Sequence, residues 1–149
     1  MKTRIIIDED NEEEIIIKCK KMTKGIESLQ EIIKNSITEN NQIVFYKDNI
    51  EYYFDLENIL FFETNGNIVN AHTLNDMFEV KYKLYELENI LPGFFTRISK
   101  STIVNINKIY SINKNITSSS VIEFHHSYKQ VYVSRMYYKP LKEKMKGRR

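Results

Sequence analysis

From residue 42 onward, short runs of β-branched and aromatic residues alternate with turn-forming residues, and this alternation limits the fold more than any other feature. Asn65-Gly66 lies between the runs 59–64 and 68–73 and is a strong hairpin signal. Asp48-Asn49 separates the runs 43–47 and 50–56 in the same way. Further runs of this kind cover residues 77–81, 95–98, 109–112, 121–125 and 130–134. The pattern predicts a mainly β domain of antiparallel strands.

Few helices are expected in this domain. Leu84, Leu87 and Leu91 share one helical face within residues 82–91, and Pro92-Gly93 ends the segment. Residues 137–146 are predicted to form a closing helix, and residues 101–105 a short helical or irregular turn. The pattern contains no pair of helices joined by a short turn, so a helix-turn-helix is not predicted.

Residues 1–40 are predicted to form a separate β-β-α segment ahead of a domain of residues 41–149. The isoleucine-rich runs 4–7 and 14–19 predict a strand pair, and the acidic residues 8–10 between them are interpreted as a solvated turn. Ile26, Leu29, Ile33 and Ile37 then recur at helical spacing. We expect an amphipathic helix whose apolar face is covered by the β domain or by another chain.

Length and composition favour one domain with a small appendage. The chain has 149 residues with 42% hydrophobic content, which is enough for one packed core. Its only cysteine, Cys19, allows no internal disulfide and fits a reducing compartment. Because no apolar run approaches a membrane span and the N-terminus turns acidic early, a cytoplasmic protein is expected.

Charge is distributed very unevenly along the chain. Residues 1–96 carry 10 basic and 18 acidic side chains, a net of −8, whereas residues 97–149 carry 12 basic and 2 acidic ones, a net of +10, which gives +2 overall. The last eight residues hold only five of those twelve basic groups, so a solubilising tail does not explain the asymmetry. A basic region of this kind predicts a polyanionic partner.

The basic residues stand beside hydroxyl side chains at two places. Arg97, Ser99, Lys100 and Ser101 follow one predicted strand, and Ser134, Arg135 and Lys139 follow another. Ser101 at a helix start would leave backbone N–H groups free for a phosphate, and an arginine fork suits guanine or phosphate. The alternative is that Ser99 and Ser101 only cap a helix while Lys100 is solvated.

These blocks, together with residues 58–64 and 80–91, resemble the LytTR-type DNA-binding domains of bacterial transcription regulators over roughly residues 41–146. The resemblance implies an antiparallel β domain that reaches the major groove with loops. It further implies a regulator without a receiver domain, because forty preceding residues are too few for one. Paired target sites imply a homodimer at least on DNA, and regulators of this short type are similar to ones controlled by a membrane-protein partner.

The resemblance assigns expected roles to single residues. Lys100, Arg135 and Asn67 are the expected base contacts, although Asn67 also suits a turn with no further role. The expected phosphate contacts are Arg97, Ser99, Ser101, Ser134, Tyr137 and Lys139. At least one of the tyrosines after Met136 is expected to be a core residue.

The sequence leaves two other classes of function to consider. One is an interaction module whose basic half binds RNA, a membrane or an acidic protein. The other is an enzyme on a β scaffold, which the residues do not favour, since no convergent acid–base set, CxxC pair or glycine-rich phosphate loop is present. His125 and His126 are adjacent on a predicted strand, point to opposite faces and cannot share a metal. No catalytic residue, metal or cofactor is expected.

Overall fold

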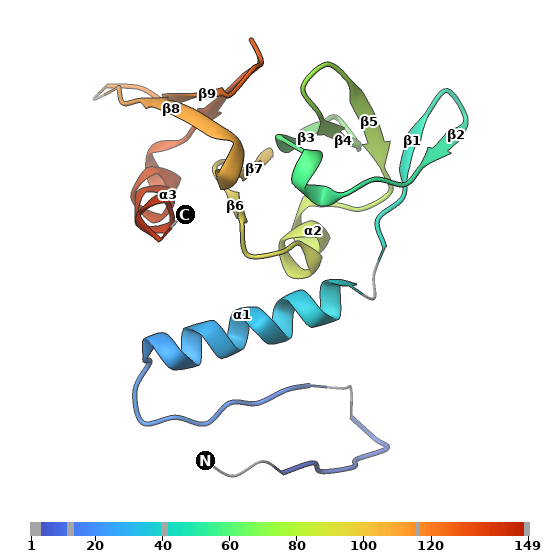
Figure 1. Ribbon diagram of the computed structural model, residues 1–149, viewed down its shortest axis with the longest axis vertical. Helices are drawn as coiled ribbons and strands as arrows, with labels where there is room; N and C mark the ends of the chain where they lie inside the picture. Colours follow the sequence, from blue (N-terminus) through green and yellow to red (C-terminus); the bar gives the residue numbers. More distant parts are fainter. Residues whose placement is uncertain (1–3, 12–13, 40–41, 116, 148–149) are drawn as a thin grey trace.

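Two antiparallel sheets and three α-helices make up the computed structural model, which describes residues 4–11, 14–39, 42–115 and 117–147, apart from the side chains of residues 37–39 (Figure 1). The larger sheet has seven strands in the order β2-β1-β5-β4-β3-β7-β6. Its strands are β1 (Phe45–Lys47), β2 (Ile50–Tyr52), β3 (Phe61–Asn65), β4 (Ile68–His72), β5 (Met77–Val80), β6 (Phe95–Arg97) and β7 (Thr102–Asn105). The predicted mainly β class is confirmed.

The smaller sheet has the order β10-β9-β8 and is followed by the last helix. It consists of β8 (Ile109–Asn113), β9 (Ser120–Phe124) and β10 (Gln130–Val133), and α3 (Arg135–Lys146) follows directly. Short 3-10 helices, Leu56–Asn58 and Ile106–Lys108, precede β3 and β8. Helix α2 (Leu84–Ile90) lies within the predicted segment 82–91.

The centre of the larger sheet is buried on both faces, because successive side chains of a strand point to opposite sides. Phe62 and Ile103 belong to a first core, which α2 covers with Leu84 and Leu87. Phe61 and Val104, on the other face, belong to a second core, which also includes Leu141 of α3 and residues of the smaller sheet. The two cores fix β3, β6 and β7 between them.

Both predicted hairpins of the larger sheet are present, one with a shifted turn. Asp48 and Asn49 both have positive φ, 53° and 64°, as a type I′ turn requires. In the second hairpin Asn65 pairs with Ile68, so the turn residues are Gly66 and Asn67 instead of the predicted Asn65-Gly66. Gly66 has φ 64°, and glycine at this first position is typical of a type II′ turn.

The prediction of a helical or irregular turn at residues 101–105 is wrong. Thr102–Asn105 is strand β7, and all four of its residues are buried. It pairs with β3 on one side and β6 on the other, so β-branched side chains packed in both cores decide its conformation. The closing helix α3 also begins earlier than predicted, at Arg135.

The predicted N-terminal strand pair is absent from the described residues, whereas the helix is present. Residues 4–11 and 14–22 contain no strand, and Ile5, Ile6 and Ile7 are 91%, 76% and 87% exposed. An isolated pair of short strands is marginally stable, and the described residues of this segment join neither sheet. The sequence also predicts that the helix frays near Asn40 and Asn41, and these two residues lie outside the described ones.

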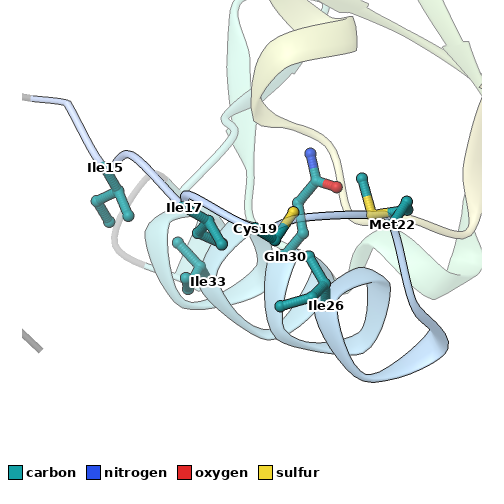
Figure 2. A pocket seen from close by; sticks show the side chains of 7 residues that line it. All are labelled: Ile15, Ile17, Cys19, Met22, Ile26, Gln30 and Ile33. Carbon is teal, nitrogen blue, oxygen red and sulfur yellow. The ribbon is translucent and has the colours of Figure 1, made fainter. Parts of the chain in front are cut away.

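Helix α1 (Lys24–Glu39) begins after Thr23, whose hydroxyl accepts a hydrogen bond from the Ile26 N–H at 3.2 Å. Ile26, Leu29 and Ile33 are half-buried, as the predicted apolar stripe requires, while the side chain of Ile37 lies outside the described residues. The helix contacts α2 beneath the larger sheet (Figure 1). Residues 15–22 run along its other side, so that Ile15, Ile17, Cys19 and Met22 line a groove with Ile26, Gln30 and Ile33 (Figure 2).

Candidate nucleic-acid interface

The turn between β6 and β7 presents Lys100. The Ser101 N–H donates to Ser99 Oγ at 3.2 Å, and the two serine hydroxyls lie 3.3 Å apart. Because strand β7 follows this turn, Ser101 does not cap a helix, and that expectation is wrong. The serines instead close the turn on itself, and Lys100 is exposed at its tip.

Arg97 lies behind this turn and braces it. Its Nε donates to the Ser99 carbonyl at 2.7 Å, and its Nη2 donates to the Lys100 carbonyl. On the other side its Nη1 lies 3.2 Å from Glu88 Oε1 of α2, and the arginine side chain is only 20% exposed. The guanidinium expected to contact phosphate is therefore directed at main-chain carbonyls and a carboxylate.

Hydrogen bonds join the Lys100 turn to the β3–β4 hairpin. The Thr64 N–H, at the end of β3, donates to the Ser101 carbonyl at 2.9 Å. The Thr64 hydroxyl contacts the same carbonyl at 3.5 Å. The Gly66-Asn67 turn follows directly, and Asn67 is exposed there.

Hydrogen bonds also join the Lys100 turn to the start of α3. The Ser134 N–H donates to the Ile98 carbonyl at 2.9 Å, and the Ser134 hydroxyl contacts that carbonyl at 3.4 Å. The hydroxyl is thereby directed away from the helix, and Ser134, at the N-cap position, makes no side-chain capping bond. We call the combined surface of the Gly66-Asn67, Ser99–Ser101 and Ser134-Arg135 segments the three-loop edge.

Arg135 is exposed at the first position of α3. Its Nη2 donates to the Thr117 carbonyl in the β8–β9 loop, so this loop lies beside the three-loop edge. No role is expected from the sequence for residues 114–119. Their mostly polar residues, asparagine, lysine, threonine and serine, indicate a polar loop. The contact between this loop and Arg135 is evident only in the folded structure.

The other expected phosphate contacts on α3 differ in exposure. Tyr137 and Tyr138 are half-buried and pack against the second core without belonging to its buried residues. The Lys114 ammonium lies 5.2 Å from the centre of the Tyr138 ring. Lys139 is exposed one turn after Arg135. The geometry thus leaves Lys139 and Lys114 accessible and turns much of Tyr137 inward.

His125 and His126 lie in a turn and not on a strand. His125 and His126 follow β9, both are exposed, and His126 has φ 59°. The expected opposite-face arrangement is therefore wrong, because the chain leaves the strand at Phe124. Within the described residues, no group of three or more His, Cys, Asp or Glu side chains is placed to hold a metal ion. Across the same residues, no helix combines the length and apolarity that a bilayer span requires.

Comparison with known proteins places the chain in one family. Residues 48–146 match the LytTr DNA-binding domain family. Uncharacterized HTH-type transcriptional regulators of Staphylococcus aureus strains NCTC 8325 / PS 47 and COL are each 31% identical over 149 residues, which cover 97% of this chain and 98% of each relative. The match therefore includes the N-terminal segment.

A solved structure supports the fold. The LytTr DNA-binding domain of a response regulator from Bacillus cereus superposes with a TM-score of 0.63 and 21% identity, covering 68% of this chain and 94% of that one. The names of the relatives include the term HTH-type. In this chain the described helices α1, α2 and α3 are separated from each other by strands, so they form no helix-turn-helix. The chain belongs to the LytTR family of DNA-binding domains.

Proposed function

We propose that the protein is a transcription regulator that binds promoter DNA with the three-loop edge facing the major groove. The observation that carries this proposal is the pair of hydrogen-bonded links, Thr64 to Ser101 and Ser134 to Ile98, which hold three segments distant in sequence on one surface. Each segment presents an exposed polar or basic side chain: Asn67, Lys100 or Arg135. Such a preorganised edge can read bases from loops without a recognition helix.

In this proposal Arg135 reads a base edge. Its guanidinium group releases the Thr117 carbonyl and donates two hydrogen bonds to guanine O6 and N7. Lys100, at the tip of its braced turn, contacts a base or an adjacent phosphate. Asn67 adds an amide at the edge of the groove. Lys139 and Lys114 bind flanking phosphates, and Ser99, Ser101, Ser134 and Tyr137 contribute hydroxyls where the groove wall approaches them.

Arg97 has a different role in this scheme from the one its sequence position suggested. Its contacts with Ser99, Lys100 and Glu88 leave it a positioning residue that holds the Lys100 turn. A planar guanidinium suits this task because its donors point in fixed directions. Replacing Arg97 should therefore impair DNA binding through the turn more than through the lost charge.

The N-terminal segment, residues 1–40, is proposed to mediate self-association on paired sites in the cytoplasm. Ile15, Ile16 and Ile32 are 64%, 63% and 62% exposed, and these are apolar side chains that a second copy would cover. A membrane-protein regulator is the other candidate for this surface. An unchanged monomer in solution and on DNA would favour that candidate over self-association.

Selection of duplexes from a random library with the full chain tests the proposed function. We expect an enriched sequence motif, preference for duplex DNA over RNA of the same sequence, and binding that weakens steeply with salt, by about 0.9 in log–log slope per neutralised phosphate. Equal binding to RNA or to acidic vesicles, with no motif, would instead support a general polyanion-binding module.

A further inference from the structure

Residues 14–19 run along α1 in the manner of a β-strand, although they belong to neither sheet. Ile15, Ile17 and Cys19 line the groove with the helix (Figure 2). Because these three side chains stand at every second position, they share one face of an extended segment. Ile16 and Lys18 belong to the opposite face and are exposed. The segment therefore has an inner face on α1 and an outer face in solvent.

The main chain of this segment has no partner within the described residues. No hydrogen bond to a main-chain N–H or carbonyl group of residues 14–19 is found there. Isoleucines at three successive positions supply strand propensity. An extended segment with unpaired N–H and carbonyl groups is a template to which a second strand can add. What the segment lacks is that second strand.

The order of charges along the segment selects the direction of pairing. Glu14 precedes the three isoleucines, and Lys18 follows them. In an antiparallel pair centred on Ile16, Glu14 of each copy lies opposite Lys18 of the other on the outer face, and Ile15 lies opposite Ile17 on the inner face. A parallel pair would instead place Glu14 beside Glu14 and Lys18 beside Lys18. Like charges directly opposite each other are destabilising, so the antiparallel pair is favoured.

We propose that residues 14–18 pair antiparallel with the same residues of a second copy, about a two-fold axis at Ile16. The proposal identifies the contact behind the self-association described above, and it rests on the proposed function. Ile15 is 64% exposed although it lines the groove, so the groove leaves room beside it for Ile17 of the second copy. A two-stranded ribbon is marginal by itself and becomes stable when it packs against a helix. Here α1 of each copy covers the inner face of the ribbon.

Disulfide cross-linking of the full chain tests the register: Cys19→Ser removes the native thiol, and Ile16→Cys then places one at the proposed axis. Directly opposite residues of an antiparallel pair have Cα atoms about 4.5–5.5 Å apart, which a disulfide spans. We expect this double variant to form covalent dimers rapidly under mild oxidation with diamide. The wild type should not, because Cys19 lies three residues from the axis in each chain, which separates the two cysteines by about 20 Å. Cys19→Ser with Ile50→Cys, on the exposed β1–β2 hairpin, is the matched control and should form no covalent dimer.

Exchange of the two charges tests the same contact without a thiol. Glu14→Lys and Lys18→Glu should each weaken self-association about tenfold in sedimentation equilibrium, because each turns two attractive pairs into repulsive ones. The double variant restores both pairs and should associate as the wild type does. Within one extended chain the two positions lie about 13 Å apart, so only pairing between copies explains such a rescue. Lys142→Glu, at an exposed position of α3, should leave self-association unchanged.

Rapid cross-linking of the wild type through Cys19 would indicate parallel pairing and overturn the proposal, as would a double charge variant that associates as weakly as the single ones. If circular dichroism shows that the cysteine variant is unfolded, the charge exchange decides. DNA titration of the same proteins separates this proposal from the proposed function. A chain that selects a DNA motif but fails both tests contradicts the ribbon alone, whereas a chain that passes both tests and selects no motif contradicts the proposed function alone.

Discussion

Arg97 joins Glu88 to the turn that presents Lys100: its Nη1 lies 3.2 Å from Glu88 Oε1, while its Nε donates to the Ser99 carbonyl at 2.7 Å. A carboxylate on α2 thereby orients a guanidinium, and the guanidinium orients a turn. Neither the Glu88 carboxylate nor the Arg97 guanidinium needs to touch DNA to affect binding.

Glu88→Gln should weaken cognate DNA binding, by roughly two- to fivefold, the size of a modest surface interaction. This sign is informative, because removing an acid from a DNA-binding protein should by charge alone strengthen binding. Glu79→Gln is the matched control, because Glu79 of β5 is also an exposed acid. This variant should bind DNA with unchanged or slightly higher affinity. Fluorescence anisotropy at one salt concentration measures all three proteins. Tighter binding by both variants would show that Glu88 acts only through its charge.

Lys100→Ala should weaken cognate and random duplexes to a similar extent and make the log–log salt slope shallower by about one unit, if the ammonium lies mainly on phosphate. Lys81→Ala removes the same charge from an exposed position after β5 and should leave the slope unchanged. Anisotropy titrations over a salt series measure the slope. Equal slopes for wild type and both variants would place Lys100 away from DNA.

The free energy of unfolding should decrease as the pH is lowered, because of His72. This ring stacks on Phe61 at 4.2 Å between centroids, and burial, with the Lys129 ammonium, lowers its pKa from 6.5 to about 4. The unfolded chain then binds more protons between pH 6.5 and about 4, so the contribution is complete above pH 6.5 and is lost as the pH falls toward 4. After allowance for solvent screening, about 2 kcal/mol of unfolding free energy is involved.

Urea unfolding at a series of pH values measures this effect. His72→Gln should flatten the dependence within that window, whereas His126→Gln, in an exposed turn, should retain it. An identical pH dependence in wild type and His72→Gln would show that another group is responsible.

Self-association should depend on the exposed isoleucines of the N-terminal segment. Ile16→Asp places a charge on a residue that is 63% exposed, so the monomer should remain folded while the contact between copies is lost. Ile50→Asp is the control on the β1–β2 hairpin, where Ile50 is 53% exposed. Sedimentation equilibrium should show association of wild type and Ile50→Asp only. A wild type that stays monomeric at every concentration would contradict this prediction.

Local patterns predicted most of the β domain because turn chemistry and strand alternation are properties of neighbouring residues. The Asp48-Asn49 hairpin and the segment around α2 needed no knowledge of distant parts of the chain. Residues 102–105 were mispredicted although three of them are β-branched or apolar, since their strand conformation depends on β3 and β6 on either side. The strands predicted from the N-terminal isoleucine runs are absent for the opposite reason: local strand propensity is present, but the described residues of these runs pair with neither sheet.

The sequence predicted which segments form the candidate site, but it did not predict the role of each residue in them. Basic and hydroxyl residues in loops identified the Lys100 and Arg135 segments, and hydrogen bonds through Thr64 and Ser134 join these segments in the fold. Sequence could not show that Arg97 turns inward, because the side chain's partner, Glu88, lies on another element. The contact of Arg135 with the Thr117 loop is likewise a product of long-range folding.

The central claim is that the three-loop edge reads DNA sequence, and competition titration of Arg135→Ala against single-base-changed sites tests it most directly. The variant should lose about 1–3 kcal/mol on the cognate site and lose preference at one base pair, while Lys139→Ala weakens all sites alike. Arg135→Lys should keep the charge yet remain unselective at that pair, because it lacks the planar fork. If Arg135→Ala retains wild-type affinity and selectivity at every position, the edge does not read the sequence.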